Sequence, residues 1–153
     1  MPKVGESNAI EVEVRVKAKP EAVFQLLTDP AKYHLWMGSK ATLEAKVGGM
    51  YRVVFNERDV AKGTYIEVVP NRRVVFTWGW EQAGNPIPPE SSTVEIDLVP
   101  AGNETIVKLR HTGLPEPAAS PHREGWVMYL DRLAVVGRGG DPGADPNAKP
   151  RQM

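Results

Sequence analysis

The stretch PHREGWVMYLDRLAVV, residues 121–136, decides the fold of this 153-residue chain. Its apolar residues Trp126, Leu130 and Leu133 recur at spacings of four and three, which places them on one face of a helix. Ser120 suits the N-cap, because its hydroxyl can accept a backbone N–H, and the proline that follows needs no N–H in a first turn. The sequence therefore predicts a helix about 24 Å long, with one face that must be buried.

Upstream of this helix, the sequence is typical of strands with one apolar face. In residues 10–16, isoleucine and valine alternate with charged residues, the period-two pattern of a half-solvated strand. Two short helices are predicted at residues 21–27 and 31–36, followed by six more strands. Because such a sheet needs a covering layer on its dry face, we predict an α+β fold with about seven antiparallel strands and the long helix against them.

The period-two pattern also assigns individual side chains to faces of the sheet. It points Thr64, Ile66 and Val68 inward from one strand. In a later strand it places Glu95 and Asp97 together on the solvated face. Paired carboxylates can cleave glycosides, but a wet face favours ordinary surface residues.

Composition and charge limit the classes of function. With 41% hydrophobic and 25% charged residues, the chain fits one globular domain. Lysine plus arginine and aspartate plus glutamate number 19 each, so no basic field exists to attract phosphates and we predict no nucleic-acid partner. The absence of cysteine excludes disulfides, thiolate catalysis and cysteine-ligated metals.

The two ends of the chain carry no apolar pattern. Residues 1–9 lack the core of a signal peptide, and no apolar run approaches the roughly 20 residues that span a bilayer, so we expect a cytoplasmic protein with no membrane partner. Residues 137–153 hold four glycines and three prolines. We predict a flexible N-terminus at residues 1–9, a domain at residues 10–137 and a disordered tail at residues 138–153.

Aromatic side chains gather on the faces predicted to lie between sheet and helix. Such rings are ordinary core material, but they also line small-molecule pockets, and both interpretations stay open. The predicted ligand-binding set is Trp36, Tyr51, Phe55, Phe76, Trp78, Trp80, His111, His122, Trp126 and Tyr129.

The histidines are the candidates for chemistry. His111 has the inward parity of the last strand, where it could orient a ligand, act as acid or base, or be a buried imidazole with a local partner. His122 lies one turn before Trp126 and is expected near the same mouth. The third, His34, lies far away in sequence. No spacing matches a metal, phosphate or serine-nucleophile motif, so we predict no metal, no cofactor and no catalytic residue.

Five segments resemble the START-like (SRPBCC) superfamily and, within it, the activator of heat-shock-protein-90 ATPase homologue family. They are VGGMYRVVF at 47–55, GTYIEVVPNRRVVFTWGW at 63–80, TVEIDLVP at 93–100, LRHTGLP at 109–115 and HREGWVMYLDRL at 122–133. The resemblance implies a helix-grip fold, in which a curved sheet wraps the C-terminal helix and leaves a cavity. Family members include ligand carriers, chaperone regulators and polyketide cyclases, so the fold alone does not fix the function.

We therefore predict a START-like protein that binds a small hydrophobic or aromatic molecule in this cavity. Two alternatives stay open: a chaperone ATPase co-regulator, and a cyclase- or hydrolase-type enzyme that uses a cavity histidine. The missing catalytic motifs favour a binding protein over an enzyme. A homodimer is also an open prediction, since sheet edges near Met50 or the loop at residues 81–90 could pair with a second copy.

Overall fold

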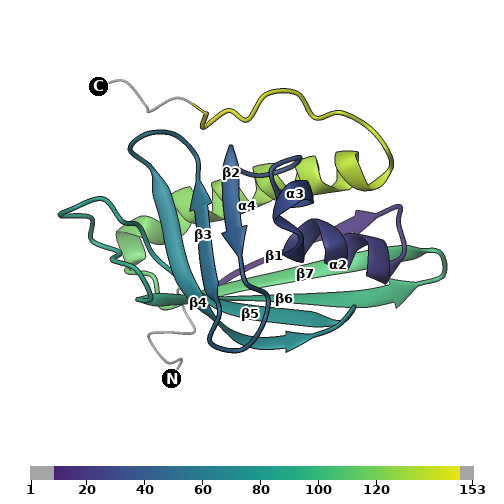
Figure 1. The fold of residues 1–153 in the computed structure, drawn as a ribbon, viewed down its shortest axis with the longest axis horizontal. Coiled ribbons are helices and arrows are strands. Elements are labelled where there is room, and N and C mark those ends of the chain that lie inside the picture. Colours follow the sequence, from purple (N-terminus) through teal and green to yellow (C-terminus); the bar gives the residue numbers. More distant parts are fainter. Residues whose placement is uncertain (1–8, 149–153) are drawn as a thin grey trace.

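The computed structural model describes residues 9–148, in which seven antiparallel strands bend around one long helix (Figure 1). The elements in chain order are β1 (Ile10–Val16), α2 (Pro20–Thr28), α3 (Pro30–Tyr33), β2 (Lys40–Leu43), β3 (Met50–Val54), β4 (Val60–Val69), β5 (Arg73–Trp78), β6 (Ser92–Ala101), β7 (Glu104–Thr112) and α4 (Glu116–Gly137). The strand order is β1-β7-β6-β5-β4-β3-β2. The predicted α+β helix-grip fold is confirmed.

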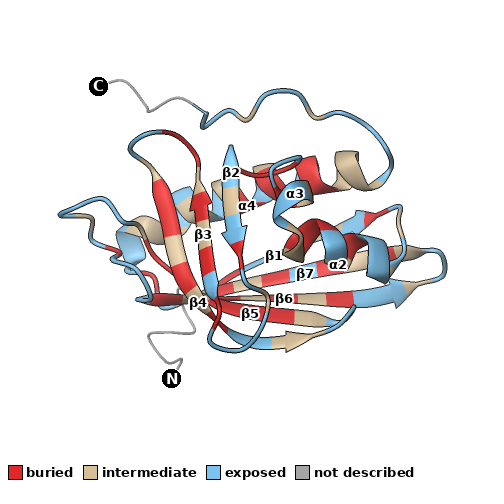
Figure 2. Ribbon diagram, viewed as in Figure 1, coloured by how far each residue is buried: buried red, intermediate tan, exposed pale blue. Residues whose placement is uncertain are grey.

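The core lies between the inner face of the sheet and α4. From Ser92 to Leu98 in β6, buried residues alternate with half-exposed ones, and the neighbouring strand β7 has a similar alternation (Figure 2). From α4, the buried apolar residues are Trp126, Tyr129, Leu130 and Leu133. This face is the one that the helical period predicts. Each such side chain contributes about 1.5–3 kcal/mol when fully buried.

The start of α4 differs from the prediction. The helix begins at Glu116, five residues before Pro121, and Pro115 occupies the N-cap position. Pro117 suits a first turn as well as Pro121 does, and the acidic Glu116 beside it favours a helix N-terminus, so the helix begins at this earlier proline. Pro121 consequently lies inside the helix and removes one internal hydrogen bond, and Ser120 is not the cap.

The inward face of β4 was predicted incorrectly for two of three residues. Tyr65 is buried, whereas Thr64 is half-exposed and Ile66 is 49% exposed. The cause is a shift in the pairing of β4 with β5 between Tyr65 and Glu67. An irregularity of this kind reverses which parity faces the core. Val68, beyond the shift, packs against the core as predicted.

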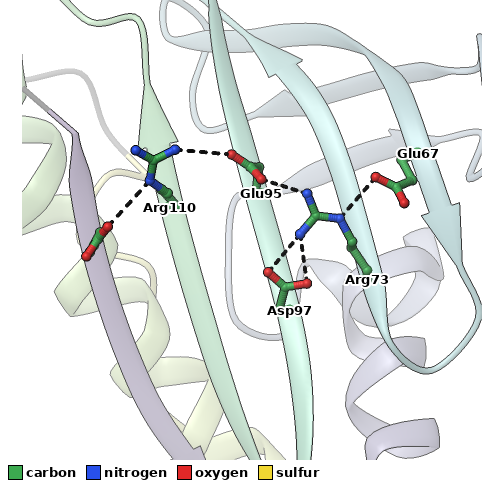
Figure 3. A network of polar contacts seen from close by, with 6 residues as sticks. Glu67, Arg73, Glu95, Asp97 and Arg110 are labelled. Atoms are coloured by element: carbon green, nitrogen blue, oxygen red, sulfur yellow. Dashed lines mark hydrogen bonds and ion pairs between the residues drawn. The ribbon is translucent and has the colours of Figure 1, made fainter. Parts of the chain in front are cut away.

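The outer face of the sheet carries a charged network (Figure 3). Arg73 donates to Glu67, to Glu95 and to both oxygens of Asp97, at 2.6–3.0 Å. Arg110 lies 3.7 Å from Glu95. Glu95 and Asp97 therefore lie on the outer face, as predicted, and their oxygens are engaged by an arginine. Exposed pairs of this kind are worth about 0–1 kcal/mol each.

The segment after α4 folds back along the helix in the part that the structure describes. Figure 1 shows it returning over α4 towards the hairpin of β3 and β4. Arg132 donates to the carbonyls of Pro142, Gly143 and Ala144 at 3.1–3.2 Å. We name residues 141–148 the C-terminal strap. The tail predicted to be disordered is thus placed up to residue 148; residues 149–153 and the predicted flexible residues 1–8 lie outside the described part. No helix between residues 9 and 148 is long and apolar enough to cross a membrane.

Candidate functional site

A cavity of about 780 Å³ opens between β3–β5, α4 and the C-terminal strap. Phe55 directly follows β3, Trp78 lies in β5, and Asn147 belongs to the C-terminal strap. The complete lining is Met37, Phe55, Arg58, Asp59, Trp78, Trp80, Pro121, His122, Gly125, Trp126, Tyr129, Pro146 and Asn147.

The aromatic residues of the cavity pack against one another. Trp78 lies 5.4 Å from Trp80 and 5.3 Å from Trp126 between ring centroids. On the other side, Phe55 lies 5.6 Å from Trp80 and 5.7 Å from Tyr129. All of these pairs are tilted or edge-on, the arrangements that aromatic quadrupoles favour. The rings thus form a continuous wall that runs from the sheet to α4.

A hydrogen-bonded chain behind this wall holds His111, which is fully buried. The Trp126 indole N–H donates to His111 Nδ1 at 2.9 Å. The Ser92 hydroxyl donates to the Trp78 carbonyl at 2.8 Å, so it accepts from His111 Nε2, also at 2.8 Å. These partners assign the proton to Nε2. Both imidazole nitrogens are therefore occupied by protein groups.

His122 has the opposite tautomer. Its Nδ1 lies 2.9 Å from the carbonyl of Ala118, which can only accept, so the proton is on Nδ1. Its Nε2 accepts from the Trp80 indole N–H at 3.1 Å. The two imidazole rings lie 5.7 Å apart at right angles. Each histidine therefore orients one tryptophan of the cavity wall.

Burial keeps both histidines neutral. It lowers the pKa of His111 from 6.5 to about 3, with a smaller effect from charge on His122. Burial also lowers the pKa of His122, although its bond to Ala118 opposes the shift. Since each neutral ring makes one accepting and one donating bond, neither presents a free nitrogen to the cavity. The arrangement positions aromatic rings rather than a proton-transfer group.

Trp78 differs from the other three tryptophans. Trp36 donates to the Leu26 carbonyl at 2.8 Å, and Trp80 and Trp126 donate to histidines. The Trp78 indole N–H is buried and has no partner within residues 9–148. Buried N–H groups are nearly always paired, so the Trp78 indole is an exception among the four tryptophans.

The mouth of the cavity is polar. Arg58 and Asp59 lie 3.5 Å apart, and the Asn56 amide donates to Asp59 and to the strap carbonyl of Asn147, both at 2.9 Å. Burial raises the pKa of the Tyr129 hydroxyl, which donates to Asp145. Within the described residues, no group of histidine, aspartate or glutamate side chains could hold a metal ion.

The structure brings together six of the ten predicted site residues. They are Phe55, Trp78, Trp80, His122, Trp126 and Tyr129. The other four lie behind the lining: Trp36 and Tyr51 are fully buried, Phe76 stacks on Tyr51 at 3.9 Å, and His111 bonds Trp126. Period-two alternation identifies the inward face but not how deep along the strand the cavity extends.

Sequence reasoning missed the lining residues that come from loops and the strap. These are Met37, Arg58, Asp59, Pro146 and Asn147, together with the helix residue Pro121. Gly125 also lines the cavity, and it carried a signal in the sequence, because a glycine inside a helix needs a local reason such as close approach to the sheet or an opening into a pocket. A Cβ built on it meets no atom within 4 Å, so the glycine opens the helix surface towards the cavity.

Solved structures with this fold include an AHSA1-like protein from Rhizobium etli. It is 41% identical to this chain, with a TM-score of 0.72 over 95% of this chain and 91% of that one. DynU16, from the dynemicin biosynthetic locus, is 25% identical with a TM-score of 0.76, and the match covers 88% of this chain and 49% of DynU16. The chain thus spans about half the length of DynU16.

The Aha1 dimer from Colwellia psychrerythraea shares the fold at 20% identity, with a TM-score of 0.75 over 88% of this chain and 98% of that one. No curated protein matches the chain. The family model for Activator of Hsp90 ATPase homolog 1-like protein matches residues 17–137, most of the domain. The chain therefore belongs to the Activator of Hsp90 ATPase homolog 1-like family.

Proposed function

We propose that this protein binds a small hydrophobic or aromatic molecule in the cavity between the sheet and α4. The observation that carries this proposal is the cavity itself, about 780 Å³ in volume and walled by aromatic rings. Ligand sites of about 300–1,000 Å³ that combine apolar walls with a few polar groups suit drug-sized molecules.

The chemistry of the walls favours a flat aromatic ligand. Trp78, Trp80 and Trp126 offer faces and edges for stacking, each ring pair being worth about 0.5–1.5 kcal/mol beyond burial. The polar mouth at Arg58 and Asp59 leaves room for a solvated substituent.

Acid–base catalysis by a cavity histidine receives less support. Both ring nitrogens of His111 and of His122 are hydrogen-bonded to protein groups, and burial lowers the pKa of each histidine. A general base needs a free nitrogen within about 2.6–3.2 Å of the atom that carries the proton it removes. Ligand binding needs no such group, and DynU16, which belongs to a biosynthetic locus, is consistent with a small organic ligand.

The test is a substitution in α4 that fills the cavity with a side chain. Because a Cβ at Gly125 meets open space, Gly125→Phe should place a ring in the cavity without moving the backbone. The control is Val127→Phe, since Val127 is 40% exposed on the same helix. Flat aromatic compounds of different sizes are titrated by tryptophan fluorescence and native mass spectrometry.

We expect Gly125→Phe to lose binding and Val127→Phe to retain it. Compounds that bind all three proteins alike would place the site elsewhere. A wild-type protein that binds no member of the panel by either method would count against the proposal.

As a second candidate, we propose self-association through an apolar patch of Val47, Met50 and Ile66. Their exposed fractions are 72%, 36% and 49%, and backbone hydrogen bonds between the loop before β3 and β4 hold them close together. The dimeric Aha1 of Colwellia supports the idea by analogy. Sedimentation should show a dimer that Val47→Asp dissociates, while Val99→Asp on another exposed site does not. A monomer at all concentrations would exclude it.

The chaperone co-regulator alternative rests on the family description alone. If the chain acts on such a partner, purified Hsp90 should change its ATP hydrolysis rate when the chain is added. An unchanged rate, together with no co-elution of the two proteins, would remove this alternative.

A further inference from the structure

The C-terminal strap covers the cavity but contributes nothing to the apolar core. Pro146 and Asn147 line the cavity, yet none of residues 141–148 is buried. The strap also lies beyond Gly137, where the match to the family model ends. Hydrophobic burial therefore does not hold it in place, and its position depends on polar contacts.

Asp145 is the main anchor. Its carboxylate accepts from the Gly38 backbone N–H at 2.8 Å and from the Tyr129 hydroxyl at 2.8 and 3.0 Å. Gly38 follows α3 and Tyr129 belongs to α4, so one carboxylate bridges two walls of the cavity. Bonds to a charged acceptor are the stronger kind of hydrogen bond. The Asn147 amide adds a bond to the same hydroxyl at 2.9 Å.

Arg132 fixes the other end of the strap. Arg132 is 8% exposed, and its guanidinium donates to the carbonyl of Trp36 at 2.9 Å, as well as to the three strap carbonyls. These backbone contacts hold the chain direction without depending on strap side chains. Pro142 and Pro146 further restrict the free strap, which reduces the entropy that docking must overcome.

We propose that the strap is a gate of the cavity, released at Asp145 and hinged near Arg132, through which ligands enter and leave. Segments held by exposed polar contacts and few buried ones open locally at low free-energy cost, whereas the aromatic wall and the sheet do not. Release of Asp145 removes Pro146 and Asn147 from the lining and leaves the rest of the site intact. This inference rests on the proposed function, because a gate needs a ligand.

The test compares two aspartates of the strap. Asp145→Ala removes the bonds to Gly38 and Tyr129, together with a bond from Asn147 N–H within the strap. Asp141→Ala removes the same charge from a residue whose carboxylate, among residues 9–148, accepts only from Gly143 N–H within the strap. Tyr129→Phe gives an independent variant that keeps the ring. The probe is anilinonaphthalene sulfonate, an aromatic fluorescent dye, mixed with the full chain in a stopped-flow fluorimeter.

A gate makes the observed binding rate reach a plateau as the dye concentration rises, because opening becomes rate-limiting. We expect Asp145→Ala to raise that plateau at least tenfold, Tyr129→Phe to raise it less, and Asp141→Ala to leave it unchanged. Dye that binds Asp145→Ala but not the wild type would also support the gate.

Two results would overturn the inference in different ways. Binding rates that rise linearly with dye concentration and are equal in all four proteins would remove the gate and leave the proposed function standing. Absence of dye binding to the wild type and to Asp145→Ala alike, by fluorescence and native mass spectrometry, would count against both.

Discussion

Acidification should destabilise this protein through His111. The folded state holds the ring neutral, since Nδ1 accepts from Trp126 and the fully buried site excludes water. Protonation would turn that acceptor into a second donor facing an indole N–H. Burial, with a smaller contribution from His122, accordingly lowers the pKa of His111 from 6.5 to about 3.

The sign and size of the effect follow from linkage. Below about pH 6.5 the unfolded chain carries a proton on His111 that the folded chain does not bind, so stability is complete above that pH and falls as the pH decreases towards 3. The slope is about 1.4 kcal/mol per pH unit. His111 alone should therefore remove about 2 kcal/mol between pH 6.5 and 5, against a typical total of about 5–15 kcal/mol.

Urea unfolding between pH 5 and 7.5 measures this slope. His111→Gln should have a lower free energy of unfolding at neutral pH. As the pH falls, its free energy of unfolding should decrease less steeply than that of the wild type, by a slope equivalent to the uptake of close to one proton on unfolding. The control is His34→Gln, the same substitution at an exposed position. In NMR spectra, the ring signals of His111 should not titrate between pH 7 and 5. Equal slopes for His111→Gln and wild type, or a ring that titrates near pH 6, would refute the reasoning.

Two further predictions concern the groups around His111. Ser92→Ala leaves the His111 Nε2–H and one bond to the Trp78 carbonyl unmade, so chemical denaturation should show a loss of about 2–4 kcal/mol. Ser91→Ala, next to it but exposed, should lose less than about 1 kcal/mol, and equal losses would contradict the network. Trp78→Phe and Trp126→Phe remove the same side-chain volume, but only the Trp126 indole N–H is hydrogen-bonded within residues 9–148. Trp126→Phe should therefore be the less stable variant by about 1–3 kcal/mol. A less stable Trp78→Phe would contradict this assignment.

Much of the site was accessible from alternation in the sequence. Trp78 and Trp80 share parity with Val74 and Phe76, and that parity does face the helix. His111 follows the buried Val107 and Leu109 by the same rule, and it is buried. These predictions hold because each strand segment pairs in regular register with its neighbours, so the period of two continues unbroken.

The same rule failed where the register is irregular. In β4 the pairing shifts after Tyr65, and Ile66 faces solvent although its parity relative to Val68 predicts burial. Gly63 carried a signal: a Cβ there would lie within 2 Å of the Thr77 carbonyl, so only glycine fits. A lone glycine in a strand indicates a close backbone approach or a bulge, and either one makes counting by twos unsafe.

The sequence pattern did not predict which inward-facing residues of a strand line the cavity and which pack in the core. Tyr51 and Phe76 have the correct parity, yet Tyr51 bonds the Tyr33 hydroxyl at 2.6 Å in the packed end of the core. An inward-facing ring lines the cavity or packs against another side chain, depending on which residues of the short helices lie opposite it. Tyr33 comes from α3, and no local pattern in β3 or β5 encodes that partner.

The order of the strap depends on contacts that its own composition does not reveal. Judged alone, residues 141–148 have too little apolar surface to offset the entropy of ordering, and the structure agrees that none of them is buried. What changes the outcome is Arg132, a charged residue three positions after Tyr129 on the buried side of α4. A guanidinium held there needs acceptors, and it takes them from backbone carbonyls, which every sequence has. A charge on the apolar face of a predicted helix, followed by a proline-containing segment, is therefore reason to expect that segment to fold back over the helix.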